Sequence, residues 1–328
     1  MDNIYQFSGD LITWLQSLGG WLVSLMKFFS FLGTEEFYLI IAPAILWCWD
    51  AALGLQLGLS LMISASFNSI FKLVFHGPRP YWLDHRVAGL ASETSFGIPS
   101  GHSQNAMVLW GTLAHRFRKA TGWILAGIII FLIGLSRLVL GVHFLQDVLA
   151  GWLLGGLILW ILIKIRRPVT NWINKHSITE QILAAFLISL GFILLGLLAK
   201  ISAANFDIPV EWSEMAAKAY PDEPITPSSL AGLISNAGAF FGLAAGALWL
   251  EYKGGFRTQG LWWQLGLRYI LGLVGVLIFW FGLGEVFPRG EEIGPLLLRY
   301  LRYTLVGCWI TGIAPYLFRV LKLAQGKN

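Results

Sequence analysis

The sequence predicts an all-α protein that crosses a membrane many times. Of its 328 residues, 56% are hydrophobic and only 12% are charged, whereas soluble domains carry about 25% charged residues. The mean hydropathy is +0.67. Many apolar runs are roughly 20 residues long, which is the length a helix needs to cross a bilayer. We therefore expect a polytopic membrane helical bundle, and we attribute the net charge of +5 to cytoplasmic loops and not to a nucleic-acid partner.

About nine transmembrane helices are predicted, preceded by an N-terminal interfacial amphipathic helix. Residues 1–35 are apolar along one helical face and hold Trp14, Trp21 and Lys27, as expected of a helix that lies on a membrane surface. The acidic start MDNIYQFSGD argues against a signal peptide. The predicted spans cover about residues 37–50, 53–75, 102–116, 122–141, 144–165, 179–200, 228–250, 262–285 and 296–320.

Basic residues predict the orientation. If nine spans are counted, four basic segments lie on one side, and they hold Arg116, Arg118, Lys119, Lys164, Arg166, Arg167, Lys175, Lys253, Arg257, Lys322 and Lys327. The acidic loop 201–226 lies on the other side. Because loops rich in Lys and Arg stay in the cytoplasm, we expect the N-terminus outside, the C-terminus in the cytoplasm, and the chain in the plasma (inner) membrane.

Three segments are expected within the chain. Residues 1–35 form the interfacial helix, residues 36–165 a catalytic helical core, and residues 166–328 a set of C-terminal membrane helices. In the last segment, a ladder of Gly238, Gly242 and Gly246 is typical of helices that pack closely in lipid. The two cysteines lie inside apolar runs, so no disulfide framework is predicted.

Polar residues with chemical potential gather at the outer ends of the first five spans. The second span ends SASFNSIFKLVFHGPRPYW, with Lys72 and Arg79 about two helical turns apart if the helix continues. The fourth ends GLSRLVLGVHFLQDVLAG, which supplies Arg137, His143 and Asp147. Charges this close to hydrocarbon are costly and by default mark function.

The third span starts with Pro99-Ser100-Gly101-His102. Proline and serine favour a helix start, glycine permits close approach to the backbone, and histidine exchanges protons near neutral pH. Taken alone, the tetrapeptide also fits an ordinary helix cap. Together with the neighbouring cations, however, it predicts a functional site.

The combined residues indicate an anion site. Asp147 follows His143 by four residues, so it can accept the proton of one imidazole nitrogen and leave the other free to attack. The same pair fits a metal, but Lys72, Arg79 and Arg137 would repel a divalent cation and suit a phosphate dianion. Helix N-termini at Ser100–His102 and near His143 would add backbone N–H donors.

Three motifs occur in order: KxxxxxxRP from Lys72 to Pro80, PSGH at residues 99–102, and SRxxxxxHxxxD from Ser136 to Asp147. The sequence thereby resembles the type 2 phosphatidic acid phosphatase family, which includes glucose-6-phosphatases, sphingosine-1-phosphate phosphatases and vanadium haloperoxidases. The resemblance covers roughly residues 35–165.

The resemblance implies a role for each motif residue. His143 would attack phosphorus and become a phosphohistidine, Asp147 would orient it, and His102 would protonate the leaving oxygen and later activate water. The phosphoryl oxygens would be held by Lys72, Arg79, Ser100, Gly101 and Arg137. No cofactor or metal is expected, because fixed cations supply the charge stabilisation.

The expected function is a membrane-embedded lipid phosphate phosphatase that acts on a monoester or pyrophosphate outside the cytoplasm. The expected partners are the substrate and membrane lipids, with no nucleic acid and no obligate protein partner. A phosphotransferase to a lipid acceptor and a phosphatase of a small soluble ester stay open within the family. A transporter, flippase or scaffold is the non-enzymatic alternative, and it gives no reason for a complete catalytic set.

Other polar residues receive plainer interpretations. His76 and His85 are expected to be solvated loop residues. Asn68 is expected to hydrogen-bond either the Lys72 amine or a neighbouring helix. Arg268, Arg299 and Arg302 lie near span ends, where lipid-headgroup anchors are common.

Overall fold

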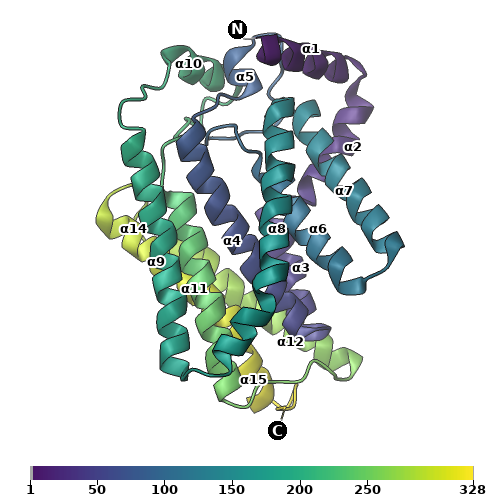
Figure 1. The fold of residues 1–328 in the computed structure, drawn as a ribbon, viewed down its shortest axis with the longest axis vertical. Coiled ribbons are helices and arrows are strands. Elements are labelled where there is room, and N and C mark those ends of the chain that lie inside the picture. Colours follow the sequence, from purple (N-terminus) through teal and green to yellow (C-terminus); the bar gives the residue numbers. More distant parts are fainter. Residues whose placement is uncertain (1–2, 328) are drawn as a thin grey trace. The chain divides into compact units, whose positions relative to one another are not determined.

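The computed structural model describes residues 3–327, and all of their regular elements are helices (Figure 1). The α-helices are α1 (Asn3–Ser17), α2 (Gly20–Phe31), α3 (Glu35–Cys48), α4 (Ala51–Phe75), α5 (Pro80–Leu83), α6 (Gly101–Phe117), α7 (Ala120–Val139), α8 (Leu145–Ile173), α9 (Ile178–Ser202), α10 (Val210–Ala219), α11 (Ala231–Tyr252), α12 (Trp262–Leu277), α13 (Leu283–Val286), α14 (Ile293–Cys308) and α15 (Ala314–Val320). Two π-helices, η1 (Ile278–Gly282) and η2 (Trp309–Ile313), continue α12 and α14. The all-α prediction is confirmed.

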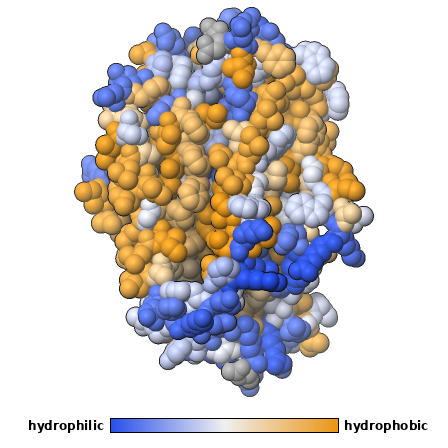
Figure 2. All heavy atoms as spheres, viewed as in Figure 1, coloured by the Kyte–Doolittle hydropathy of each residue, from blue (hydrophilic) through white to orange (hydrophobic). Residues whose placement is uncertain are grey.

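Helices lie in all nine predicted ranges, but they differ in their capacity to span a bilayer. Six helical segments are long and apolar enough: Ala51–Leu83, Ala120–Val139, Leu145–Ile173, Ile178–Ser202, Ala231–Tyr252 and Trp262–Val286. Hydrophobic residues cover much of the helical surface visible in Figure 2. Helix α6 has only 17 residues and many polar ones, and α14 with η2 and α15 lies outside the group of six. The number of crossings therefore stays a prediction.

The sequence predicts one helix in the N-terminal segment, but the structure has two. Gly19 has φ of 105°, a conformation that glycine adopts at no steric cost, and it separates α1 from α2. Helix α1 is amphipathic, since Ile12 is buried while Trp14 is exposed. Helices α2 and α3 are bent by 46° and together are apolar and long enough for one broken span or a re-entrant loop.

The chain divides into two compact units whose segments alternate along the sequence. Unit 1 consists of residues 1–37, 67–161 and 196–229, and unit 2 of residues 38–66, 162–195 and 230–328. All the predicted site residues fall in unit 1. The predicted segments 1–35, 36–165 and 166–328 follow the chain and not these units.

The core of unit 1 joins the N-terminal helices to the segments that hold the motifs. Ile12, Trp82, Phe96 and Phe144 are buried in one apolar cluster. Burial of large side chains stabilises a fold by about 1.5–3 kcal/mol each, so this cluster fixes the loops around it. Helix α1 is also tied to the loop after α5, because Gln16 exchanges hydrogen bonds with the Ala88 backbone at 2.8 and 3.0 Å.

Unit 2 has its own core around Trp47. This side chain is fully buried and donates a hydrogen bond to Ile310 O at 2.8 Å. The glycine ladder packs as predicted, since a Cβ at Gly238 or Gly242 would collide with the backbone of Tyr300 or Thr304. These glycines therefore permit α11 and α14 to approach closely.

Candidate active site

Lys72 and Arg79 meet, but not on one continuous helix. Helix α4 ends at Phe75, and His76 has φ of 49°, so the predicted two helical turns are interrupted before Arg79. The two side chains converge instead on Ser95. The hydroxyl of Ser95 accepts hydrogen bonds from Lys72 Nζ at 2.8 Å and from Arg79 Nη2 at 3.1 Å. Ser95, in the loop between α5 and α6, thus brings the Lys72 and Arg79 side chains together, although α4 does not continue to Arg79.

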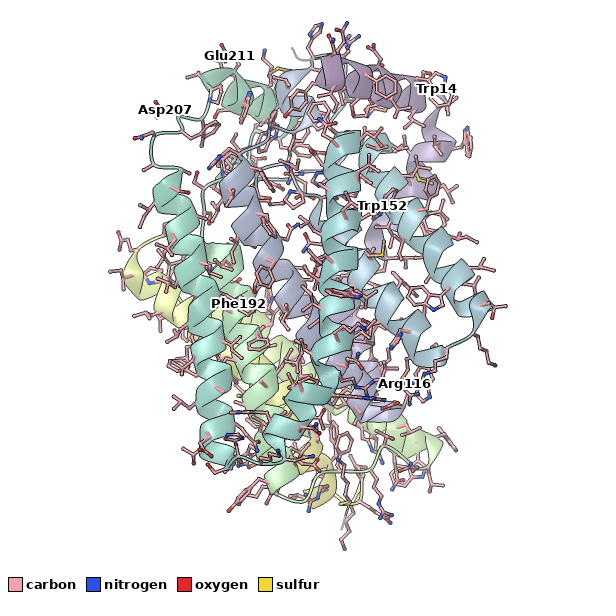
Figure 3. All side chains as sticks on the ribbon, viewed as in Figure 1. Trp14, Arg116, Trp152, Phe192, Asp207 and Glu211 are labelled. Atoms are coloured by element: carbon pink, nitrogen blue, oxygen red, sulfur yellow. The ribbon has the colours of Figure 1, made fainter. Side chains whose placement is uncertain are left out.

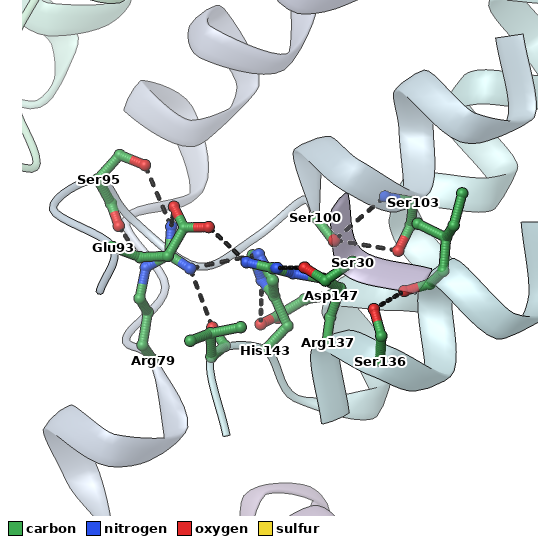
Figure 4. A network of polar contacts seen from close by, with 12 residues as sticks. Ser30, Arg79, Glu93, Ser95, Ser100, Ser103, Ser136, Arg137, His143 and Asp147 are labelled. Atoms are coloured by element: carbon green, nitrogen blue, oxygen red, sulfur yellow. Dashed lines mark hydrogen bonds and ion pairs between the residues drawn. The ribbon is translucent and has the colours of Figure 1, made fainter. Parts of the chain in front are cut away.

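Arg79 is completely buried, and its guanidinium donates to several backbone carbonyl oxygens in addition to the side chains drawn in Figure 4. Its Nε donates to Ser95 O at 2.6 Å, its Nη1 to Val142 O at 2.9 Å, and its Nη2 to Phe96 O at 3.1 Å. A guanidinium presents its donors in a rigid fork. Together with His143 Nε2, the Ser95 hydroxyl and Glu93, these acceptors engage all five N–H groups of Arg79, so an anion can bind this side chain only by displacing one of them.

The PSGH turn starts α6, as predicted. Ser100 is the N-cap, and its Oγ accepts hydrogen bonds from the backbone N–H and hydroxyl of Ser103 at 3.4 and 3.0 Å. One hydrogen of Ser100 is left to donate, because a hydroxyl has one donor and two acceptor positions. The Ser100 N–H donates to Asp147 O at 3.0 Å, which joins this turn to the start of α8.

Asn68 supports the same turn. Its Nδ2 donates to Pro99 O at 3.2 Å and to Gln104 Oε1 at 2.9 Å. A Cβ at Gly101 would lie 3.1 Å from Asn68 Oδ1. Of the two predicted roles, Asn68 therefore satisfies the neighbouring helix and buttresses the PSGH backbone.

His143 and Asp147 form the predicted pair, with His143 in the turn that precedes α8. Asp147 Oδ2 lies 3.3 Å from His143 Nδ1 and accepts the Phe144 N–H at 2.9 Å. His143 Nε2 lies 3.2 Å from Arg79 Nη1. Because a guanidinium only donates, Nε2 is the acceptor and the ring proton is on Nδ1, toward Asp147. Burial, followed by the charge of Arg79, holds the pKa of His143 below its ordinary value.

The N-terminus of α8 offers fewer free backbone donors than predicted. The Phe144 N–H binds Asp147, and the Leu145 N–H donates to Ser8 Oγ at 2.8 Å. The start of α6 differs, because the N–H groups of Gly101 and His102 have no acceptor among residues 3–327. Within residues 3–327, the α6 terminus thus leaves two adjacent N–H groups without an acceptor, whereas the α8 terminus leaves that of Gln146 alone.

Arg137 is buried at the end of α7. Its Nη1 donates to Ser30 Oγ at 2.6 Å, and its Nη2 donates to a Glu93 carboxylate oxygen. Ser30 lies in α2, within the segment predicted to be only a membrane-surface helix. The N-terminal region thus contributes directly to the site.

Glu93 is a site residue that was not predicted from the sequence, and it contacts two of the predicted cations. Its carboxylate bridges the two arginines, with Oε2 at 3.3 Å from Arg79 Nη2 and Oε1 bound to Arg137 Nη2 (Figure 4). Burial alone would raise the pKa of Glu93, but Arg79, Arg137 and Lys72 together hold it well below its ordinary value. The negatively charged carboxylate of Glu93 therefore lies between the guanidinium groups of Arg79 and Arg137.

His102 lies beside this cluster in the first turn of α6. A Cβ at Gly33 would stand 3.0 Å from His102 Cδ2, so the ring rests on the bare backbone between α2 and α3. His102 has no hydrogen-bond partner among residues 3–327. Its ring nitrogens are thus available to a bound molecule.

Two of the plainer interpretations are wrong. His76 is not a solvated loop residue, because its ring stacks on Phe206 with centroids 4.7 Å apart and meets Phe96 edge-on at 5.2 Å. Arg268 is fully buried and is not a headgroup anchor; it donates to backbone carbonyls that include Thr258 O at 2.7 Å and Gln259 O at 2.9 Å. His85 is exposed, as predicted.

Comparisons with known proteins identify the family. Residues 53–171 match the PAP2 superfamily, and residues 234–326 match the PAP2 superfamily phosphatase transmembrane extension. Phosphatidylglycerophosphatase B of Bacillus subtilis (strain 168) is 34% identical over 160 residues, which are 44% of this chain and 74% of that protein. This chain belongs to the PAP2 superfamily. The family resemblance drawn from the motifs is thereby confirmed, and the chain is a membrane phosphatase of that superfamily.

Other PAP2 relatives differ in how much of the chain they share. Human glucose-6-phosphatase 2 is 23% identical and aligns with 100% of this chain and 99% of its own. Lipid phosphate phosphatase delta of Arabidopsis thaliana is 26% identical over 48% of this chain and 41% of that protein. A crystal structure of a PAP2-type phosphatidylglycerolphosphate phosphatase from Bacillus subtilis aligns with a TM-score of 0.43 and 30% identity, over 51% of this chain and 88% of that one.

Proposed function

We propose that this PAP2 phosphatase hydrolyses a phosphate ester through a phosphohistidine on His143, with no metal ion. The observation that supports this most is the convergence of three cations and an oriented imidazole in unit 1. Lys72 and Arg79 meet on the Ser95 hydroxyl, Arg79 and Arg137 meet on the Glu93 carboxylate, and the unprotonated Nε2 of His143 accepts from Arg79 Nη1 at 3.2 Å.

In the first step, His143 Nε2 donates its lone pair to phosphorus and the P–O bond to the leaving group breaks. His102 gives a proton to the departing oxygen, and Asp147 stabilises the positive imidazole that forms. In the second step, His102 takes a proton from water as the water oxygen attacks phosphorus. The P–N bond then breaks, and inorganic phosphate and neutral His143 are released.

The remaining residues stabilise charge during both steps. Arg79 and Arg137 would bind the phosphoryl oxygens through planar forks, while Lys72 supplies a mobile point charge. Ser100 and the N–H of Gly101 add neutral donors at the α6 terminus. Phosphoryl transfer depends mostly on such positioning and charge stabilisation.

A lipid phosphate is the first candidate substrate. The site residues lie at the ends of apolar helices, where a headgroup in the membrane surface can reach them. The Bacillus relative is named as a phosphatidylglycerophosphatase, which supports a phosphorylated lipid. Phosphatidate, a polyprenyl pyrophosphate and a sphingoid-base phosphate belong to the same class.

A small soluble phosphate ester is the second candidate. The alignment with human glucose-6-phosphatase 2 extends over the whole chain, whereas the alignment with the Bacillus relative covers 44% of it. The helices beyond residue 171 are therefore shared with a protein named for a sugar phosphate. This observation favours testing glucose 6-phosphate beside the lipids.

A phosphate-release assay on the purified chain in micelles tests the proposal. We expect release from at least one lipid phosphate, undiminished in EDTA and inhibited by vanadate, which mimics the phosphoryl group. Glucose 6-phosphate in the same assay decides between the two substrate classes, and an added acceptor lipid detects phosphotransfer. Activity that disappears in EDTA and returns with magnesium or zinc would refute the metal-independent site.

We further propose that the site opens on the outer side of the plasma (inner) membrane. Within unit 1, Figure 3 places Trp14, Asp207 and Glu211 at one end of the helices and Arg116 at the other. Arg116 belongs to a basic segment, which supports a cytoplasmic location. The motif loops start at the end of α4 and of α7, opposite to Arg116, and this favours an N-terminus outside and a C-terminus in the cytoplasm.

Single cysteines at Ser92 and Thr170 test this orientation. Each is introduced into a variant of the protein that lacks Cys48 and Cys308, and the variant is labelled in intact cells. Ser92 lies in the loop that holds Glu93, and Thr170 is exposed near the basic end of α8. An impermeant maleimide is expected to label Ser92→Cys and to spare Thr170→Cys until the membrane is permeabilised. Labelling of Thr170→Cys alone would invert the proposed topology.

Glu93 is expected to compete with the substrate phosphate for the two arginines. Glu93→Gln removes the negative charge with little change in shape, so vanadate should inhibit about tenfold more tightly, on the order of one charge-assisted contact. Glu223→Gln, an exposed change in the acidic loop, serves as the control. Weaker vanadate inhibition in Glu93→Gln would instead assign Glu93 to positioning the arginines.

A further inference from the structure

We propose that unit 2 holds a second anion site, a pocket that binds a phosphate oxyanion. The pocket has a volume of about 290 Å³ and is lined by residues from η1 to α14. Three arginines and one carboxylate face it: Arg289, Arg299, Arg302 and Glu285. All of these residues belong to unit 2, whereas the candidate active site belongs to unit 1.

The positive charge of this pocket is poorly compensated. Arg289 and Glu285 are 3.5 Å apart, with 79% and 59% of their side chains exposed. Arg299 and Arg302 form no ion pair with any carboxylate in residues 3–327. Within the described part of the chain, Arg299 makes one side-chain hydrogen bond, from Nη1 to the Ser235 hydroxyl at 3.4 Å. Two guanidinium groups next to apolar helices without counter-ions favour an anion from outside the chain.

Arg302 is preset for such a ligand. Its Nε is buried without a hydrogen-bond partner, and its guanidinium lies over the Tyr303 ring at 4.9 Å. A Cβ at Gly284 would stand 2.6 Å from Arg302 Nη1. The guanidinium therefore rests on the bare backbone of α13, which a larger residue at this position would obstruct.

The helix that forms the opposite wall is locally widened. Helix α12 continues as the π-helix η1, which contributes Trp280 and Phe281 to the pocket. Single π-helical turns occur frequently at functional sites. The pocket thus combines arginine forks, which match phosphate oxygens, with aromatic rings, which are enriched at the membrane interface.

The ligand chemistry is a phosphate oxyanion beside an apolar surface. By the predicted topology, the loop between α13 and α14 lies on the outer side of the membrane. Two sources supply this chemistry there: the phosphodiester of an anionic phospholipid and free inorganic phosphate, the product of the proposed reaction. The aromatic wall favours the phospholipid.

Calorimetric titration of the full chain in nonionic micelles tests the site. The probes are dihexanoyl-phosphatidylglycerol, dihexanoyl-phosphatidylcholine and inorganic phosphate, each titrated into the wild type and into the double variant Arg299→Gln, Arg302→Gln. Because the double variant leaves unit 1 unchanged, any difference isolates the pocket. Arg166→Gln, an exposed arginine on α8, is the matched control.

We expect phosphatidylglycerol to bind about tenfold or more weakly to the double variant, since two charge-assisted contacts are lost. Gly284→Leu should give the same loss by displacing Arg302, and it provides a second route if the double variant does not fold. Weakening confined to the lipids identifies a headgroup site, whereas equal weakening for inorganic phosphate identifies a free-phosphate site. Unchanged affinity for all three probes in both variants would overturn the proposal.

Discussion

His143→Ala is expected to abolish phosphate release, with kcat reduced by about 10⁴-fold or more. The imidazole supplies the attacking atom, and the group that its Nε2 contacts, the Arg79 guanidinium at 3.2 Å, is a cation and cannot replace it as a nucleophile. Lys72, Arg79 and Arg137 remain in the variant, so the affinity for substrate should persist. The slope of the phosphate-release rate against enzyme concentration, at saturating substrate, gives kcat for the wild type and for the variant.

The matched control is His85→Ala, because this histidine is exposed in the loop after α5 and has no part in the proposed chemistry. It should release phosphate at the wild-type rate. Brief reaction with substrate labelled at phosphorus, followed by quenching in alkali, should leave label on the wild type and on His85→Ala but not on His143→Ala. Phosphate release by His143→Ala at rates near those of the wild type would rule out covalent catalysis by this residue.

The sequence sufficed for the parts of the site whose chemistry is local. Ser100 caps α6 because a serine hydroxyl accepts from the first turn wherever a helix begins. Asp147 reaches His143 because four residues bring two side chains together at a helix start. Both results depend on contacts within a few residues, and a pattern of residue types records such contacts directly.

The parts that were missed depend on loops far apart in the chain. Nothing in the sequence distinguishes Glu93 and Ser95 from other polar loop residues. They enter the site because the segment between α5 and α6 folds back over Arg79 and bonds to it through backbone and side chain. Ser30 was missed because an apolar helix was interpreted only as a membrane anchor. The signal that could have pointed to Glu93 is the need of Arg79 and Arg137 for a negatively charged partner, since Glu93 is a carboxylate in the loop between the first two motifs.

The errors on His76 and Arg268 have one physical origin. A polar side chain is expected to be exposed to solvent only when no other part of the chain packs against it or hydrogen-bonds it. Both His76 and Arg268 have such a partner. His76 is covered by Phe206 and Phe96, which come from segments before α10 and α6. Arg268 is satisfied by backbone carbonyls of Thr258, in the loop between α11 and α12, and of Leu323, in the segment after α15. Every loop residue carries a carbonyl that can accept a hydrogen bond, but its position in space is not visible in one sequence.

His102→Ala is expected to have the second largest effect, and its size should depend on the leaving group. A positioned acid contributes about 10²–10⁴-fold when the departing oxygen needs a proton. An alkyl phosphate, including a lipid phosphate monoester, has such an oxygen, whereas nitrophenolate departs readily from a nitrophenyl phosphate as an anion. The variant should therefore lose far more activity on the lipid than on the aryl ester.

The structure supports this role through three observations on His102. It stands in the first turn of α6, directly after the Gly101 N–H that would hold a phosphoryl oxygen; its ring rests against Gly33; and neither ring nitrogen is engaged within residues 3–327. Such an imidazole is free to face the leaving oxygen first and the attacking water second.

The second step gives an independent measurement for the same variant. Without a base to activate water, phosphohistidine on His143 should accumulate during turnover of the aryl ester, so an initial burst of nitrophenol should precede a slow steady rate. The double variant His102→Ala, His143→Ala should lack the burst, because it cannot form the intermediate. Equal losses on the alkyl and aryl esters, with no burst, would show that His102 positions the substrate and does not transfer the proton.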